Sequence, residues 1–251
     1  MTAVERWASE LAAWAIDPEI LAAAPESPYG FPPGLFGADR GTPATVAAAR
    51  AAGPRSVLDV GCGGGAASIP VGAAELLAVD ESAELLERYR AAAGAMPVRT
   101  WRGRWPDVAG EVPAADVAVA ANVVYNVPDI AEFLVALTDH ARRRVVVELT
   151  DAHPWTSLAG LWRHFHGQDR PSGPTAELFG EVLAELGLAA ESVIEPRTDP
   201  WREAPEDVVV AFTRRRLCLP VSREPEVAEA MRRFRDDRPR TATVFWWAGT
   251  A

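Results

Sequence analysis

Short apolar runs alternate with segments of helical periodicity over most of the chain, from Arg55 onward. Strands that are apolar along their whole length are typical of a parallel sheet buried between helices on both faces. The pattern therefore predicts an α/β fold with a doubly wound, mostly parallel sheet. The predicted strands cover residues 56–60, 76–79, 98–101, 116–121, 144–149, 190–195 and 241–247.

Helical periodicity indicates helices before, between and after these strands. They cover residues 4–16, 18–24, 82–93, 130–141, 176–186, 205–218 and 224–235. We expect one domain over residues 1–251, because a single α/β domain accommodates a chain of this length. Its expected parts are N-terminal helices and a strap (1–50), a ligand-binding half (51–150) and a second half (151–251) with a helical insertion at about 205–236.

Residues 25–34 contain four prolines and two glycines, which rules out regular secondary structure there. The same stretch carries Tyr29 and Phe31, so it is more aromatic than a simple linker. Two interpretations remain open at this point. The segment is either a surface strap held down by its aromatic rings or a lid over a ligand.

All 25 basic residues are arginine, and this excludes chemistry that needs a lysine. Schiff-base catalysis and the Gly-Lys-Ser/Thr phosphate loop both depend on that residue. The 35 acidic residues give a net charge of −10, which argues against nonspecific nucleic-acid binding because such binding draws its affinity from a basic surface. The run Arg214–Arg216 is predicted to be a solvated helix face or to contact the acidic body.

Three features of the sequence bear on the cellular compartment. The two cysteines cannot make a disulfide framework and suggest a reducing compartment. The first residues lack the basic-then-apolar order of a secretory signal. No apolar run approaches the roughly 20 residues that span a bilayer. We therefore expect a cytoplasmic protein without a membrane span.

The most informative motif is the glycine run Gly61–Gly65, between a predicted strand and the expected start of a helix. Glycines permit positive φ and let a ligand approach the backbone closely. Asp80 ends the next strand, about 20 residues after the first glycine, where a carboxylate suits the two hydroxyls of a ribose. The structural alternative is a tight turn followed by a helix-capping aspartate. Together, the run and the spaced acid favour a nucleoside site.

The spacing of Gly61, Gly63 and Ala66 also fits the dinucleotide pattern G-x-G-x-x-A. Asp59 favours another ligand, because a carboxylate at the strand end repels a pyrophosphate but helps to orient a cation.

The segment VLDVGCGGG followed by LLAVD resembles the first two motifs of class I S-adenosylmethionine-dependent methyltransferases. The resemblance runs from about Arg55 to Leu149, and the final TATVFWW run is similar to the antiparallel seventh strand of that family. It implies a seven-stranded Rossmann-like sheet, S-adenosylmethionine as the cofactor, and methyl transfer as the reaction.

The resemblance also implies roles for individual residues. Asp59, Gly61 and Gly63 would line the methionine end of the cofactor, and Asp80 would hold the ribose. Two further residues of this stretch belong to the expected cofactor site: Cys62 within the turn, as small filler rather than a nucleophile, and Glu81, through its backbone or as plain surface.

Two positions follow the third and fourth strands. The family places an acid after its third strand to read the adenine amine, but Arg104 stands there in this chain. Trp105 beside it either flanks the adenine or belongs to the core. Asn122 is implied to contact the methionine part. The run from Asn122 to Tyr125 is not the Asn-Pro-Pro-Tyr signature of amino-methylating enzymes, which argues against methylation of nucleic-acid bases.

Catalytic candidates lie after the fourth and fifth strands. Methyl transfer from a sulfonium needs a general base only where the acceptor must lose a proton. His153, His166 and Tyr125 are the candidates for that role, with ordinary loop positions as the alternative. His164 and His166 lack accompanying cysteines or a carboxylate cluster, so we predict no metal site.

Four aromatic residues are predicted to form an apolar or aromatic pocket for the acceptor: Tyr29, Phe31, Tyr125 and Trp155. A second hydrophobic layer under the added helices is the alternative. The leading function is methylation of a small molecule. A noncatalytic S-adenosylmethionine-binding module and an NAD(P)-dependent dehydrogenase that uses the G-x-G-x-x-A run are the two other hypotheses.

Overall fold

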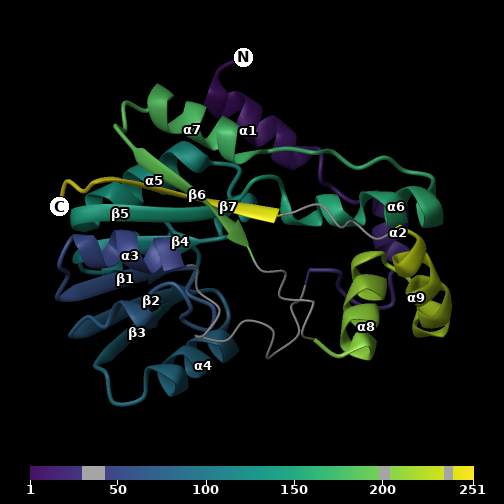
Figure 1. The fold of residues 1–251 in the computed structure, drawn as a ribbon, viewed down its shortest axis with the longest axis horizontal. Helices are drawn as coiled ribbons and strands as arrows, with labels where there is room; N and C mark the ends of the chain where they lie inside the picture. Colours follow the sequence, from purple (N-terminus) through teal and green to yellow (C-terminus); the bar gives the residue numbers. More distant parts are fainter. Residues whose placement is uncertain (30–42, 198–203, 235–239) are drawn as a thin grey trace.

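The computed structural model describes residues 1–29, 43–197, 204–234 and 240–251. Its centre is a seven-stranded sheet of order β3-β2-β1-β4-β5-β7-β6 (Figure 1). Strands β1 to β5 pair in parallel, and β7 runs antiparallel to both of its neighbours. The mostly parallel, doubly wound fold predicted from the sequence is therefore confirmed. The strands are β1 (Ser56–Val60), β2 (Glu75–Asp80), β3 (Val98–Arg102), β4 (Ala115–Ala121), β5 (Ala141–Thr150), β6 (Glu191–Arg197) and β7 (Arg240–Ala248).

Helices cover both faces of the sheet. One face packs against α3 (Pro43–Ala51) and α4 (Ala83–Ala93), and the other packs against α1 (Ala3–Ala12), α5 (Ile130–Asp139) and α7 (Ala176–Glu185). Successive side chains of a strand point to opposite faces of the sheet. Val57 therefore packs in the core under α3 and α4, and Leu58 packs in the core under α1, α5 and α7. This burial on both faces explains why the strands are apolar throughout.

A third group of helices stands beyond the carboxyl ends of the parallel strands (Figure 1). We call it the helical cap: α2 (Pro18–Ala23), α6 (Ala159–His166), α8 (Glu206–Arg216) and α9 (Glu224–Arg233). It has its own small core, which includes Trp162, Leu217 and Val227. Helices α8 and α9 lie between β6 and β7 in the chain, at the place predicted for a helical insertion.

The main departure from the sequence prediction follows the glycine run. The expected helix is absent, and residues 61–74 contain only turns and a three-residue 3₁₀ helix, Ile69–Val71. Pro70 removes a backbone donor, and Gly72 ends the short helix with φ +76°. Conversely, α3 and α6 form in segments for which no helix was predicted.

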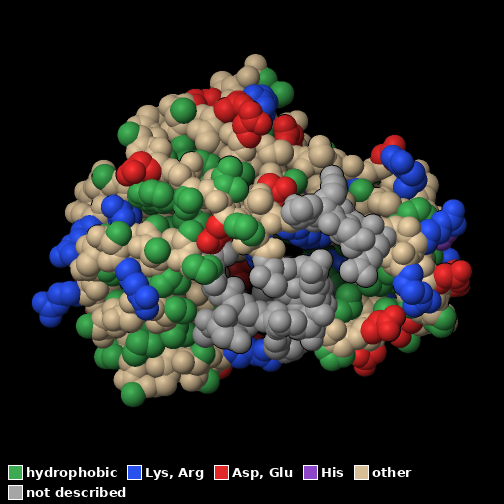
Figure 2. Space-filling model, viewed as in Figure 1, with side chains coloured by type: hydrophobic (Ala, Val, Ile, Leu, Met, Phe, Trp, Pro, Cys, Tyr) green, Lys and Arg blue, Asp and Glu red, His purple; other side chains and the backbone are tan. Residues whose placement is uncertain are grey.

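The described part of the chain contains no helix that is both long and apolar enough to cross a bilayer. Acidic and basic side chains are scattered over the face seen in Figure 2. Two grooves are formed by described residues: one of about 750 Å³ between α8 and α9, and one of about 380 Å³ between α7 and β7. Neither is lined by residues of the glycine turn.

Candidate active site

The glycine turn leaves the carboxyl end of β1 and is fastened to β2. The backbone N–H groups of Gly61 and Cys62 both donate to the carbonyl of Val79, at 2.8 and 3.1 Å. Gly61 has φ +66°, and a Cβ atom there would lie 2.5 Å from the Val123 side chain. The turn and the segment after β4 therefore touch at a point where only glycine fits.

Gly63 differs from Gly61 in its surroundings. Its φ is +49°, and among the described residues no atom beyond its two chain neighbours would lie within 4 Å of a Cβ at this position. The open space above this backbone is what close approach by a ligand requires.

Asp80, at the end of β2, faces the same turn. One carboxylate oxygen accepts from the Gly63 N–H at 3.0 Å and the other from the Ser82 N–H at 2.9 Å. A carboxylate oxygen has two lone-pair directions, so each oxygen keeps one for another donor. The half-buried side chain can thus receive two ribose hydroxyls, and these residues fit the nucleoside part of S-adenosylmethionine.

Asp59 lies beneath the turn and is 1% exposed. The Ser68 hydroxyl contacts it at 2.5 Å and also contacts the Tyr89 hydroxyl at 2.6 Å. The pKa of Asp59 is raised to about 7: burial has the largest effect, the Ser68 hydrogen bond opposes it, and the nearby charge of Asp80 adds to the rise. In this conformation the Asp59 carboxylate faces Ser68 rather than the surface.

Three other residues of the expected cofactor site have distinct environments. Cys62 is buried, and burial raises the pKa of its thiol, so the side chain is neutral filler. Glu81 is exposed, and its carbonyl accepts from Arg102 at 3.1 Å. Trp105 is 4% exposed and contacts the carbonyl of Phe133 in the core. These contacts favour the packing interpretation of Trp105 over contact with adenine.

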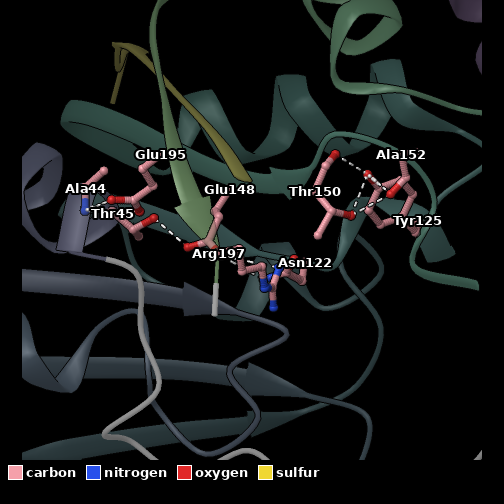
Figure 3. A network of polar contacts seen from close by, with 9 residues as sticks. All are labelled: Ala44, Thr45, Asn122, Tyr125, Glu148, Thr150, Ala152, Glu195 and Arg197. Atoms are coloured by element: carbon pink, nitrogen blue, oxygen red, sulfur yellow. Dashed lines mark hydrogen bonds and ion pairs between the residues drawn. The ribbon is translucent and has the colours of Figure 1, made fainter. Parts of the chain in front are cut away.

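Asn122 belongs to a polar network that sequence reasoning missed (Figure 3). It follows β4 with φ +59°, a left-handed conformation that asparagine tolerates better than most residues. Its amide donates to Glu148 on β5 at 3.0 Å, and its carbonyl oxygen accepts from Arg197 at the end of β6 at 2.6 Å. Glu148 is buried and also accepts from Thr45 of α3 at 2.7 Å.

The catalytic candidates Tyr125 and His153 lie together but are committed to the fold. The Tyr125 hydroxyl donates to the Thr150 carbonyl at 2.6 Å, and burial raises its pKa. His153 is stacked on Trp14 with ring centroids 3.9 Å apart. Its Nδ1 accepts from the Trp155 N–H at 3.2 Å.

The pKa of His153 is lowered to about 3, mainly by burial and in addition by the charges of Arg170 and Arg216. His153 is therefore neutral at physiological pH and a weak base. His166 lies elsewhere, in the helical cap, where its Nε2 is 2.7 Å from the Leu217 carbonyl. Within the described ranges, no cluster of three or more histidine, cysteine or acidic residues could hold a metal ion.

The predicted pocket residues Tyr29 and Trp155 are stacked with centroids 5.9 Å apart, and Tyr29 is 52% exposed. Arg216 lies over the Trp155 ring at 4.5 Å from its centroid and donates to the Pro28 carbonyl at 2.5 Å. The prediction of a solvated face for Arg214–Arg216 is wrong for its two ends, because Arg214 and Arg216 are buried. Arg214 instead pairs with acids, which was the other interpretation. Phe31 lies outside the described residues.

The raised pKa of Asp59 predicts a pH-dependent stability. Folding takes up a proton between about pH 4 and pH 7, so the free energy of unfolding falls as pH rises through that window. Asp59→Asn keeps an acceptor for Ser68 but carries no charge. We expect it to stabilise the protein at pH 8, on the order of 1–3 kcal/mol more than at pH 5. Urea unfolding at both pH values measures this difference, and an equal effect at both would contradict the assignment.

Comparison with known proteins agrees with this geometry. A family model described as a methyltransferase domain matches residues 39–193, more than half of the chain. No curated protein matches the chain significantly. The solved structure of magnesium protoporphyrin IX methyltransferase from Synechocystis PCC 6803 with bound SAH is similar at 14% identity, a TM-score of 0.52, and coverage of 82% of this chain and 80% of that one.

A SAM-dependent methyltransferase from Thiobacillus denitrificans, in complex with S-adenosyl-L-homocysteine, matches at 18% identity and a TM-score of 0.48, over 84% of this chain and 93% of that one. At 14% identity, the likeness to the Synechocystis structure shows a shared fold, and the match to the family model shows membership of the family. The chain belongs to the methyltransferase domain family and is a class I S-adenosylmethionine-dependent methyltransferase.

Proposed function

We propose that the protein methylates a small molecule, apolar or aromatic in character, held between the carboxyl ends of the strands and the helical cap. The carrying observation is the position of this cap. It stands beyond the edge of the sheet where ligands bind in α/β folds, a position that favours a small acceptor over a polymer (Figure 1). The net charge of −10 also disfavours a nucleic-acid acceptor.

The cofactor would lie along this edge. Its ribose would bind Asp80, and the cofactor would pass over the backbone of Gly63, where the Cβ direction is open. The amino-acid part would then extend toward Asn122, because the Val123 side chain meets the turn at Gly61. Charge from the buried Asp59 would favour the cationic groups of the cofactor.

S-adenosylmethionine supplies a methyl group that is already activated on a sulfonium. The chain's part is therefore to bring the acceptor into line and to exclude water, an effect with effective molarities of roughly 10⁵ M or more. Neither His153, with its pKa near 3, nor Tyr125, whose hydroxyl is hydrogen bonded, is suited to remove a proton at neutral pH. These environments support catalysis by proximity rather than by a general base.

The dehydrogenase hypothesis loses its structural basis. A dinucleotide pyrophosphate binds at the N-terminus of the helix after the glycine run. Here the chain forms only the 3₁₀ helix Ile69–Val71 in that place. The family match supports the same conclusion.

A titration with S-adenosylmethionine, S-adenosylhomocysteine and NADH tests the proposed cofactor, and transfer of labelled methyl to a panel of small aromatic acceptors tests the reaction. We expect both S-adenosyl compounds to bind, NADH not to bind, and at least one acceptor to be methylated. Binding without methylation of any acceptor class would favour the noncatalytic module.

Gly63→Ala tests the proposed path of the cofactor. A methyl group there fills the open space and should weaken S-adenosylhomocysteine binding about tenfold or more. Gly72→Ala is the matched control, since Gly72 also has positive φ and an open Cβ direction but directly follows the short 3₁₀ helix Ile69–Val71. Both variants should lose about 1 kcal/mol of stability through backbone strain. Equal affinities in isothermal titration would place the cofactor elsewhere.

Tyr29→Ala tests the acceptor wall. Loss of the exposed ring should raise the KM for an aromatic acceptor about tenfold, since such contacts contribute roughly 1–3 kcal/mol. Affinity for S-adenosylhomocysteine should change less than about threefold. Tyr29→Phe, which keeps the stack on Trp155, should behave like the original protein. Unchanged acceptor kinetics in the alanine variant would show that this stack only packs the cap.

A further inference from the structure

We propose that Arg197 binds the carboxylate of the cofactor's amino-acid part. The inference rests on the proposed placement of the cofactor along the sheet edge. Nothing in the sequence pattern points to Arg197, because it ends the last strand before the insertion, far in the chain from the glycine turn. The structure brings its guanidinium next to Asn122, where that amino-acid part would end.

The guanidinium is only partly used by the protein. Nη1 donates to the Asn122 side chain at 2.6 Å and lies 3.8 Å from a Glu148 carboxylate oxygen. The Nε and Nη2 atoms carry three further N–H donors, and no described residue accepts from them. The side chain is 21% exposed. In Figure 3 it reaches from the end of β6 toward Asn122, with part of the guanidinium directed away from Glu148.

The neighbouring residues hold this arginine in one position. The Glu148 carboxylate accepts hydrogen bonds from Thr45 of α3 and from Asn122 at the end of β4, and it lies beside Arg197. A planar guanidinium that is already oriented loses little freedom when it binds a carboxylate through two parallel hydrogen bonds. The arrangement is therefore prepared for bidentate binding.

Charge balance fits the same ligand. The amino-acid part of the cofactor is a zwitterion, and Arg197 places a cationic group beside Asn122, where the carboxylate of that part would lie. Asp80 contacts the backbone of Gly63 and Asp59 lies beneath the turn, and an ionised carboxylate at either position would repel a ligand carboxylate placed near it. A ligand carboxylate is thus favoured at the end of the site where Arg197 lies, and the ligand ammonium nearer the acids.

Arg197→Gln tests the assignment with two probes that differ by one group, S-adenosylmethionine and its decarboxylated form. Glutamine keeps a polar side chain with two N–H donors but has no charge and no guanidinium fork. We expect the variant to bind S-adenosylmethionine about 10- to 100-fold more weakly, the range for a lost hydrogen bond to a charged group. Affinity for the decarboxylated form should be unchanged. Arg197→Lys should be intermediate, because it keeps the charge but not the second donor.

Two controls separate the possible failures. Arg99→Gln removes a surface arginine paired with Glu75 on β2 and should change neither affinity. Asp80→Asn should weaken both probes equally, because both contain the ribose; no effect there would refute the proposed placement independently of Arg197.

Three outcomes would overturn the role of Arg197. An equal loss for both probes would mean that it only supports the fold. No loss for either would exclude contact with the cofactor. A rise in the KM of an acidic acceptor alone would assign the carboxylate to the acceptor instead. Thermal melting of each variant confirms that the loss is not one of folding.

Discussion

Only a hydrogen atom fits as the side chain of Gly61, and the site depends on that contact. A Cβ there would overlap Val123, so the turn after β1 packs directly against the segment after β4. The same contact helps to position Asn122, the neighbour of Val123. Through Asn122 it extends to the buried carboxylate of Glu148 and to Arg197 at the end of β6. One close backbone approach thus aligns strands from the centre of the sheet to its edge.

Aromatic contacts join further segments of the chain beyond the carboxyl ends of β4 and β5. Trp7 stacks on Tyr125 at 6.3 Å, Trp14 on His153 at 3.9 Å, and Tyr29 on Trp155 at 5.9 Å. Each pair joins a residue before the sheet to a residue that follows β4 or β5. These ring contacts therefore join the amino-terminal segment to the segments that follow β4 and β5, and the candidate residues Tyr125, His153 and Trp155 take part in them.

The sequence predicted the parts of the molecule that local pattern determines. The strands followed from apolar runs, and Gly61 and Asp80 from a motif whose spacing reflects backbone geometry. The Glu148–Arg197 pair was not predicted, because its two residues are far apart in the chain and each has the pattern of an ordinary strand residue. Arg216 was missed because a buried guanidinium between aromatic rings has no local signature. The missing helix after the turn reflects Pro70 and Gly72, two breakers whose effect was outweighed by the expectation of a regular βαβ unit.

Arg197 and Arg240 pair in register, so the last residue of β6 lies directly opposite the first residue of β7. A turn of a few residues would suffice to join antiparallel neighbours. The chain instead makes a long excursion that includes α8 and α9. The sheet places no demand on the length or composition of that excursion, whose described residues pack against α2 and α6 and contact Trp155 and Pro28 through Arg216. The proposed acceptor wall can therefore change by exchange of one segment between two fixed points, while the cofactor edge stays unaltered.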